Sequence, residues 1–148
     1  MVDKNLKRFL PWFLLIFASL ACATGGQVKL ADIPGQEGWE TAEVGDNSLV
    51  AAVIDDLNQT TDQEGIKAEY QIYRVPDGKT WEDAKTFYTR QFRSNWTEDK
   101  TLEISEEEKF NARGWTRGGV FSEQTVVIAW VEDKATGSKF LLVILFSE

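Results

Sequence analysis

Two stretches of the chain repeat their apolar residues with the spacing of a helix. In residues 48–59 the apolar side chains fall on one helical face: Leu49, Val50, Val53, Ile54 and Leu57. In residues 80–96 the large side chains recur every three or four positions: Trp81, Ala84, Phe87, Tyr88, Phe92 and Trp96. The pattern predicts two amphipathic helices. The first has its stop signal in residues 58–65, and the second starts at a capping box formed by Thr80 and Asp83.

The remaining patterns are typical of strands. Residues 66–75 alternate apolar and polar side chains, which predicts a strand with one solvated face. Further strands are predicted at 101–105, 112–121, 125–132 and 139–146, with a hairpin loop at 133–138 and a bend or bulge among the glycines of 112–121. Residues 140–146 are apolar at every position. This indicates a strand buried on both faces, or one whose second face is covered by something that the sequence does not show.

Two helices and about five strands, joined mostly by short turns, define an α+β fold. The economical arrangement is an antiparallel sheet with both helices packed on one face. The chain has 148 residues and no internal repeat. We therefore expect a single α+β domain in residues 38–148, preceded by an irregular lead-in within residues 22–37.

The first 21 residues have the pattern of a secretory signal peptide. Lys4, Lys7 and Arg8 precede an apolar run, residues 9–21, that ends at Cys22. A helix of this length, at ~1.5 Å per residue, reaches about 20 Å and is short of a ~30 Å hydrocarbon core. Pro11 weakens such a helix further. The pattern therefore predicts export of everything that follows.

Cys22 is the only cysteine of the chain. With its four preceding residues, Ala18-Ser19-Leu20-Ala21, it resembles the lipobox of bacterial lipoproteins. In that family the cysteine is acylated and becomes the first residue of the mature protein. The usual box has leucine three places before the cysteine and a small residue two places before, where this chain has Ser19 and Leu20, so it fits a permissive form of the pattern. Ordinary signal cleavage and an uncleaved anchor are the alternatives.

The residues after the signal begin with a short tether and carry a negative net charge. Residues 23–27 are small and flexible, which suits a spacer between a lipid anchor and a domain. The formal net charge is −8, and the signal contributes three basic residues and one acidic residue, so the exported part is more acidic still. This balance argues against nucleic acid as a partner and against electrostatic adhesion to anionic lipid headgroups.

The sequence excludes several chemistries. With no histidine and no cysteine besides Cys22, thiol, Ser-His and histidine-ligated metal sites cannot be built. We expect no cofactor and no metal. Residues 55–64 have some character of a calcium loop, but Thr61 and Lys67 stand where such a loop needs glycine and glutamate. A solvated helix end is the better interpretation.

Arg113, Trp115 and Arg117 form the candidate binding face. In a strand these three alternate residues share one side, and arginines beside an indole suit recognition of an anionic ligand. The alternative is an exposed strand face on which the arginines offset the acidic surface and shield the indole. Residues 106–108, three consecutive glutamates, are either half of a catalytic carboxylate pair or a solvated loop.

These observations favour a lipid-anchored, non-catalytic binding or assembly module on the extracytoplasmic side of a bacterial cell membrane. Its expected partners are the membrane, through a lipid on Cys22, and an envelope protein or an anionic ligand. The alternative is a small exported hydrolase that uses carboxylates. The exported part resembles small uncharacterised bacterial lipoproteins in layout alone, which implies no activity.

Overall fold

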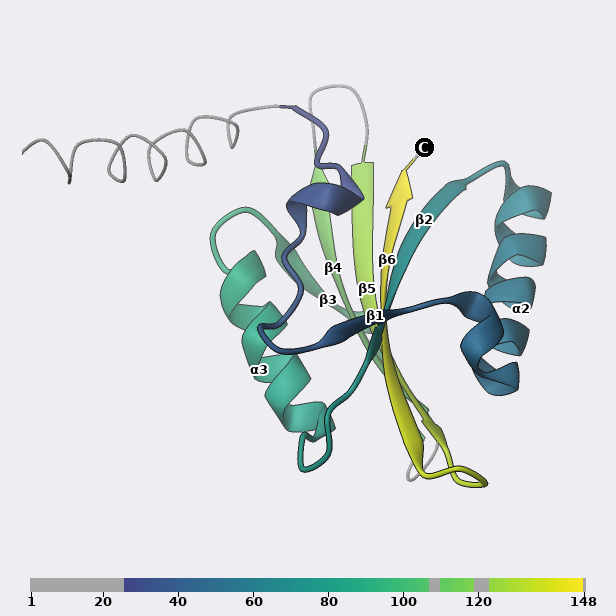
Figure 1. Ribbon diagram of the computed structural model, residues 1–148. Coiled ribbons are helices and arrows are strands. Elements are labelled where there is room, and N and C mark those ends of the chain that lie inside the picture. The colour runs from purple at the N-terminus through teal and green to yellow at the C-terminus, as the bar shows by residue number, and fades with distance from the viewer. Residues whose placement is uncertain (1–25, 107–109, 119–122, 148) are drawn as a thin grey trace, which may run out of the picture.

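Six strands of the described residues form one antiparallel sheet in the order β1-β2-β6-β5-β4-β3. The computed structural model describes residues 26–106, 110–118 and 123–147 (Figure 1). The strands are β1 (Glu40–Ala42), β2 (Lys67–Arg74), β3 (Thr97–Glu106), β4 (Phe110–Gly118), β5 (Glu123–Asp133) and β6 (Ser138–Ser147). The helices are α2 (Ser48–Glu64) and α3 (Trp81–Phe92), with the 3₁₀ turns η2 (Leu30–Asp32) and η3 (Val44–Asp46). The predicted antiparallel α+β fold is confirmed, with the edge strand β1 added.

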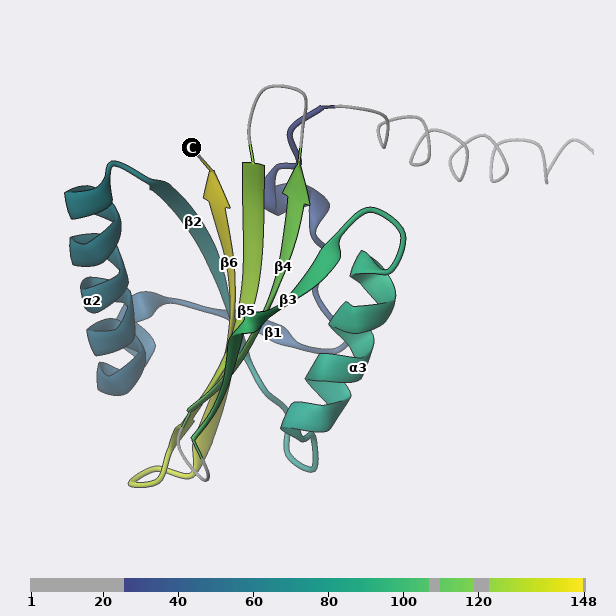
Figure 2. The ribbon, with the colours of Figure 1, turned by 180° about the vertical axis from the view of Figure 1, so that it is seen from behind.

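The two helices cover opposite faces of the sheet. Figures 1 and 2 show α2 and α3 on either side of the strands. Val50 and Ile54 of α2 pack in one apolar cluster with Leu142, whereas Tyr88 of α3 packs in a second cluster with Val143. The prediction that both helices lie on one face is therefore wrong. The physical reason is β6, whose even-numbered and odd-numbered residues belong to different clusters, so that each side needs its own cover.

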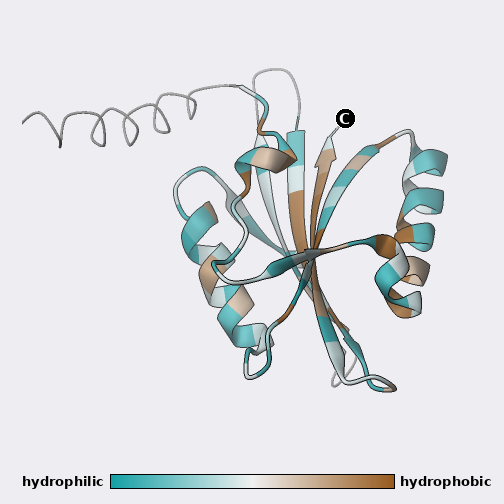
Figure 3. Cartoon of the chain, viewed as in Figure 1, coloured by the Kyte–Doolittle hydropathy of each residue, from teal (hydrophilic) through white to brown (hydrophobic). Residues whose placement is uncertain are grey.

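The hydrophobic residues concentrate where these layers meet. Figure 3 shows them along the middle of the strands and on the side of α2 that faces the sheet, with hydrophilic residues on the outside. Six consecutive residues of β6, from Phe140 to Leu145, are at most 5% exposed. The continuous apolar run in the sequence is thus explained by a central strand between two helical layers.

Residues 119–121 of the stretch predicted to be bent or bulged lie outside the described residues. Within residues 112–118, β4 pairs with β5 without a register shift, and the irregularity lies in the neighbouring strand β3. The register of β3 against β4 shifts between Asp99 and Ile104. Leu102, within this bulge, lies against Gly114: a Cβ atom added to Gly114 would be 2.5 Å from Leu102 Cδ1 and 2.8 Å from its Cβ. Gly114 is therefore required by the close approach of the two strands rather than by a bend of its own strand.

Each helix begins next to a residue whose side chain accepts hydrogen bonds from the first backbone N–H groups of the helix. Asn47 Oδ1 accepts from Leu49 and Val50 at 3.0 and 3.2 Å, and Thr80 with Asp83 makes the predicted capping box. At the other end of α2, Gly65 adopts a left-handed conformation with φ of 70°. The helix thus continues to Glu64, and the stretch with calcium-loop character is helical.

Asn47 also ties the start of α2 to the β5–β6 hairpin. Its Nδ2 donates to Asp133 Oδ2 at 2.7 Å, and Asp133 accepts further hydrogen bonds from Thr136 Oγ1 and the backbone N–H of Ala135, both at 3.0 Å. These hydrogen bonds, that from Asn47 first, lower the pKa of Asp133. One buried amide therefore caps a helix and holds a hairpin against it.

Asn47→Ala is expected to lower the free energy of unfolding by about 1–2 kcal/mol at neutral pH, because the cap is lost. The lowered pKa of Asp133 means that its stabilising contribution is present above the ordinary pKa of 3.8 and is lost as the pH falls below it. The difference between wild type and variant should therefore narrow in acid. Urea unfolding at pH 7 and pH 3 measures this, with the exposed Asn58→Ala as control. Equal differences at both pH values would contradict the role of Asp133.

Candidate functional site

Trp115 of the predicted binding face lies in the core. It shares one side of β4 with Arg113 and Arg117, but its side chain is only 2% exposed and packs against Phe92 of α3, with ring centroids 5.0 Å apart at 45°. The indole is covered by the helix and cannot stack on a ligand from solution. The residue pattern alone could not predict this burial, because it does not show which face of the sheet α3 covers.

The two arginines are separated in their roles. Arg113 Nη2 makes an ion pair with Glu98 Oε1 on β3, and both side chains are mostly buried. Arg113 Nε has no hydrogen-bond partner among the described residues. Arg117 stands opposite Gln124 in the β4–β5 register and is half-buried near the end of the strand. Arg113 is thus held in an internal pair, and Arg117 remains as a predicted contact for an anion.

The other aromatic side chains of the described residues also point inward. Trp130 makes edge-to-face contacts with Trp39 and Trp81, at centroid distances of 6.5 and 6.4 Å. Tyr88 stacks on Phe92 at 5.9 Å. Tyr88 is fully buried, and this burial raises the pKa of its hydroxyl well above the ordinary value. These aromatic residues build the core between α3 and the sheet, whereas Phe140 of β6 belongs to the cluster on the α2 side.

The described carboxylates with shifted pKa values are not arranged as general acids. Hydrogen bonds lower the pKa of Asp83, from the Thr80 backbone N–H first, and of Asp99, from the Thr101 hydroxyl first. A general acid needs a raised pKa instead. Within the described residues no three His, Cys, Asp or Glu side chains could hold a metal ion. Residues 107–108 of the acidic run lie outside the described residues, as does Cys22.

The best-defined polar arrangement involves the segment that enters the domain, residues 27–39, which we call the arm. The backbone N–H of Val28 donates to Gln124 Oε1 at 2.8 Å, and Gln124 Nε2 donates back to the carbonyl of Val28 at 2.8 Å. Gln124 Nε2 also reaches Ser147 Oγ at 3.3 Å. Gln124 is only 4% exposed. The side-chain amide of Gln124 thus makes the same pair of hydrogen bonds to the arm that the backbone of a neighbouring strand would make.

The rest of the arm is held by apolar contacts. Ile33 and Trp39 are 5% and 8% exposed and belong to the same core cluster as α3, with Val28 and Leu30 packed against it. Figure 1 shows this segment on the α3 side of the sheet. The chain is therefore part of the folded domain from Val28 onwards. Between residues 26 and 37 the predicted lead-in forms no strand, and it docks on the core through Val28, Leu30 and Ile33.

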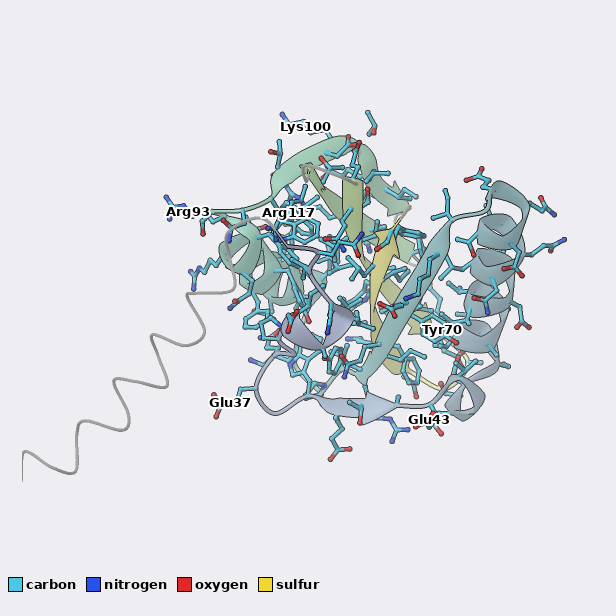
Figure 4. All side chains as sticks on the ribbon, turned by 90° about the horizontal axis from the view of Figure 1, so that it is seen from above. Glu37, Glu43, Tyr70, Arg93, Lys100 and Arg117 are labelled. Atoms are coloured by element: carbon cyan, nitrogen blue, oxygen red, sulfur yellow. The ribbon has the colours of Figure 1, made fainter. Side chains whose placement is uncertain are left out.

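A cavity of about 660 Å³ lies where the arm meets the sheet. Its lining includes Lys29, Lys67, Glu69, Gln124 and Ser147, together with Leu30 of η2. The cavity runs along the first half of β2. The outer edge of β2 is open there, because β1 pairs only with Ile72–Arg74 and no other strand of the described residues pairs with this edge. Figure 4 looks onto this end of the domain and shows Arg117 there, with Glu37 and Glu43 toward the β1 side.

The sequence patterns did not identify three residues of this site: Gln124, Lys29 and Lys67. Each of them is a common surface residue in a stretch without a motif, and they come together only because the arm crosses the ends of β2, β5 and β6. The weak available signal was Gln124, a polar residue at the start of an otherwise apolar strand. Its partner could not be predicted, because the arm carries no periodic pattern.

Comparisons with protein-family models, with curated proteins and with solved structures gave no match to this chain. In the described part of the chain no helix combines the length and the apolar character that crossing a bilayer requires. The class that the structure itself establishes is an α+β domain with an antiparallel sheet between two helices.

Gln124→Met is expected to loosen the arm while keeping the side-chain length. Val28 would lose both hydrogen bonds to the amide, so we expect a loss of about 1–3 kcal/mol in the free energy of unfolding. Hydrogen exchange at the amide of Val28 should become faster, whereas the exposed Gln91→Met on α3 should leave it unchanged. Slow exchange retained in Gln124→Met would show that the apolar contacts alone hold the arm.

Proposed function

We propose that this chain is a lipid-anchored, non-catalytic binding or assembly module on the extracytoplasmic side of a bacterial membrane. The observation that carries the proposal is the sequence of residues 4–22, a cationic start, a short apolar run and a lipobox-like end at Cys22. Diacylglycerol in thioether linkage and an N-acyl chain would supply several lipid chains. A single chain binds a membrane only marginally, and several hold it stably.

The docked arm gives the proposed anchor a geometric consequence. Six residue steps separate Cys22 from Val28, and a fully extended chain covers at most about 3.6 Å per residue, or roughly 20 Å in all. Val28 is fixed to Gln124. An anchored domain would therefore stay close to the bilayer, with the ends of β2 and β6 nearest to it.

A partner protein would bind to surfaces of the domain that lie away from the membrane and from the arm. Figure 1 places the β5–β6 hairpin at the opposite end of the domain from the arm. Along one side, α2 carries four carboxylates and no basic residue: Asp55, Asp56, Asp62 and Glu64. This acidic side supports a partner with a basic surface, since opposite charges favour encounter. The rival hydrolase has less support, because the described carboxylates with shifted pKa values have lowered ones.

Detergent phase partitioning tests the anchor. Wild-type protein expressed from the full chain in a bacterium is expected in the detergent-rich phase, because acyl chains partition with the detergent. Recovery in the aqueous phase would overturn the proposal, since the described domain exposes few large apolar side chains, Leu49 and Ile104 among them.

A further inference from the structure

The cavity beside the arm lies at the end of the domain from which the chain leads back to Cys22. Gln27, Val28 and Lys29 form part of its wall, and the Gln124 amide fixes that wall to the sheet. If Cys22 is acylated, no more than roughly 20 Å of chain separates the lipid from this wall. Whatever binds here would therefore be available at the level of the membrane surface.

The charge of the cavity differs from that of the chain as a whole. Lys29 and Lys67 line it, against the one carboxylate Glu69, whereas the full chain carries a net charge of −8. Lys67 Nζ pairs with Glu69 at 2.9 Å, but the two side chains are 70% and 43% exposed. An exposed pair of this kind is weak and leaves the ammonium group able to bind another anion.

The charges around the cavity are of both signs. Asp32 of η2 accepts a hydrogen bond from the backbone N–H of Lys29 at 3.0 Å, and no salt bridge of the Lys29 ammonium is formed within the described residues. Arg117 stands across the β4–β5 ladder from Gln124 and adds a third cation nearby. Within the cavity lining the two lysines outnumber the one carboxylate, whereas Asp32 and Glu123 offset the positive charge around it.

We propose that this cavity binds the phosphate of an anionic phospholipid headgroup, with Lys29 and Lys67 as its two ammonium contacts. The inference rests on the proposed lipid anchor, which selects a membrane phosphate over a free one by holding the cavity at the bilayer. The cavity volume falls within the range of sites for small ligands. The acidic remainder of the chain is repelled by an anionic membrane, whereas the two lysines of the cavity attract a phosphate, so the headgroup contact would fix the orientation of the domain.

The test uses the full-length protein, purified from membranes in detergent and titrated with short-chain phosphatidylglycerol while native mass spectrometry counts bound lipid. The parallel titrations use short-chain phosphatidylcholine and inorganic phosphate. Wild type should bind phosphatidylglycerol in preference to both. Lys29→Gln combined with Lys67→Gln should bind it about 30-fold more weakly, since each lysine near a lipid surface contributes an amount that corresponds to roughly fivefold in affinity.

The matched control is Lys79→Gln combined with Lys100→Gln, which removes the same charge from residues outside the cavity lining and should leave the affinity unchanged. Equal weakening in both double variants would contradict the site, because net charge alone would then explain the binding. Equal binding of phosphatidylcholine, or of inorganic phosphate, would contradict the headgroup assignment. The mass of the same purified chain shows separately whether Cys22 carries lipid, so failure of the anchor and failure of the cavity are distinguishable.

Discussion

Trp115→Ala is expected to lower the free energy of unfolding by about 3–5 kcal/mol, as large-to-small changes of a buried tryptophan do. The side chain is 2% exposed and lies between β4 and α3, against the ring of Phe92. Alanine would leave a cavity between β4 and α3, next to the ring of Phe92. Chemical unfolding followed by circular dichroism measures the loss.

Trp96→Ala is the matched control for this substitution. Trp96 also contacts Phe92, at a centroid distance of 5.5 Å, but it is only partly buried at the end of α3. Its replacement should cost clearly less. A cost below about 0.5 kcal/mol for Trp115→Ala, the range of surface substitutions, would place the indole on the surface and restore the exposed binding face.

Cys22→Ser is expected to move the protein from the membrane fraction to the soluble fraction of the envelope, or to leave the signal uncleaved. Thioether attachment needs a thiol, which the serine hydroxyl cannot replace. Each buried CH₂ of a lipid chain contributes about 0.8 kcal/mol, so loss of the chains removes the dominant membrane affinity. Cell fractionation with a carbonate wash, followed by immunoblotting, measures the distribution.

Two controls separate the lipid from other membrane contacts. Ser19→Ala changes the same short motif without touching the thiol and should leave the protein in the membrane fraction. Lys29→Gln with Lys67→Gln should also stay there, because several acyl chains hold the protein without the headgroup contact. A Cys22→Ser protein of mature size that resists the carbonate wash would contradict anchoring through Cys22.

The elements with strong local patterns could be predicted from the sequence. The aromatic repeat predicted a helix over residues 80–96, of which α3 occupies Trp81–Phe92, and the apolar run of 140–146 lies within β6. Both patterns arise within a few neighbouring residues. The face covered by each helix depends instead on long-range packing. Only the alternative given for residues 140–146, burial on both faces, pointed to the observed arrangement.

The candidate site was less accessible to prediction. Alternation along the strand correctly placed Arg113, Trp115 and Arg117 on one side of β4, but the cover over Trp115 comes from α3, a distant segment. Gln124 and Val28 are 96 residues apart and meet through a side-chain amide, for which the sequence offers no periodic signal. A site can be proposed from the sequence where its residues form a contiguous motif, as at Cys22, but not where distant residues are brought together by packing.

The most direct test of the anchored module is the intact mass of the mature protein purified from bacterial membranes. We predict a chain that begins at Cys22 and carries the added mass of a diacylglycerol and one further acyl chain. Fragmentation should place that mass on Cys22 itself. A mature chain with an unmodified Cys22, or one cleaved after it, would contradict the lipid anchor and, with it, the proposed orientation of the domain on the membrane.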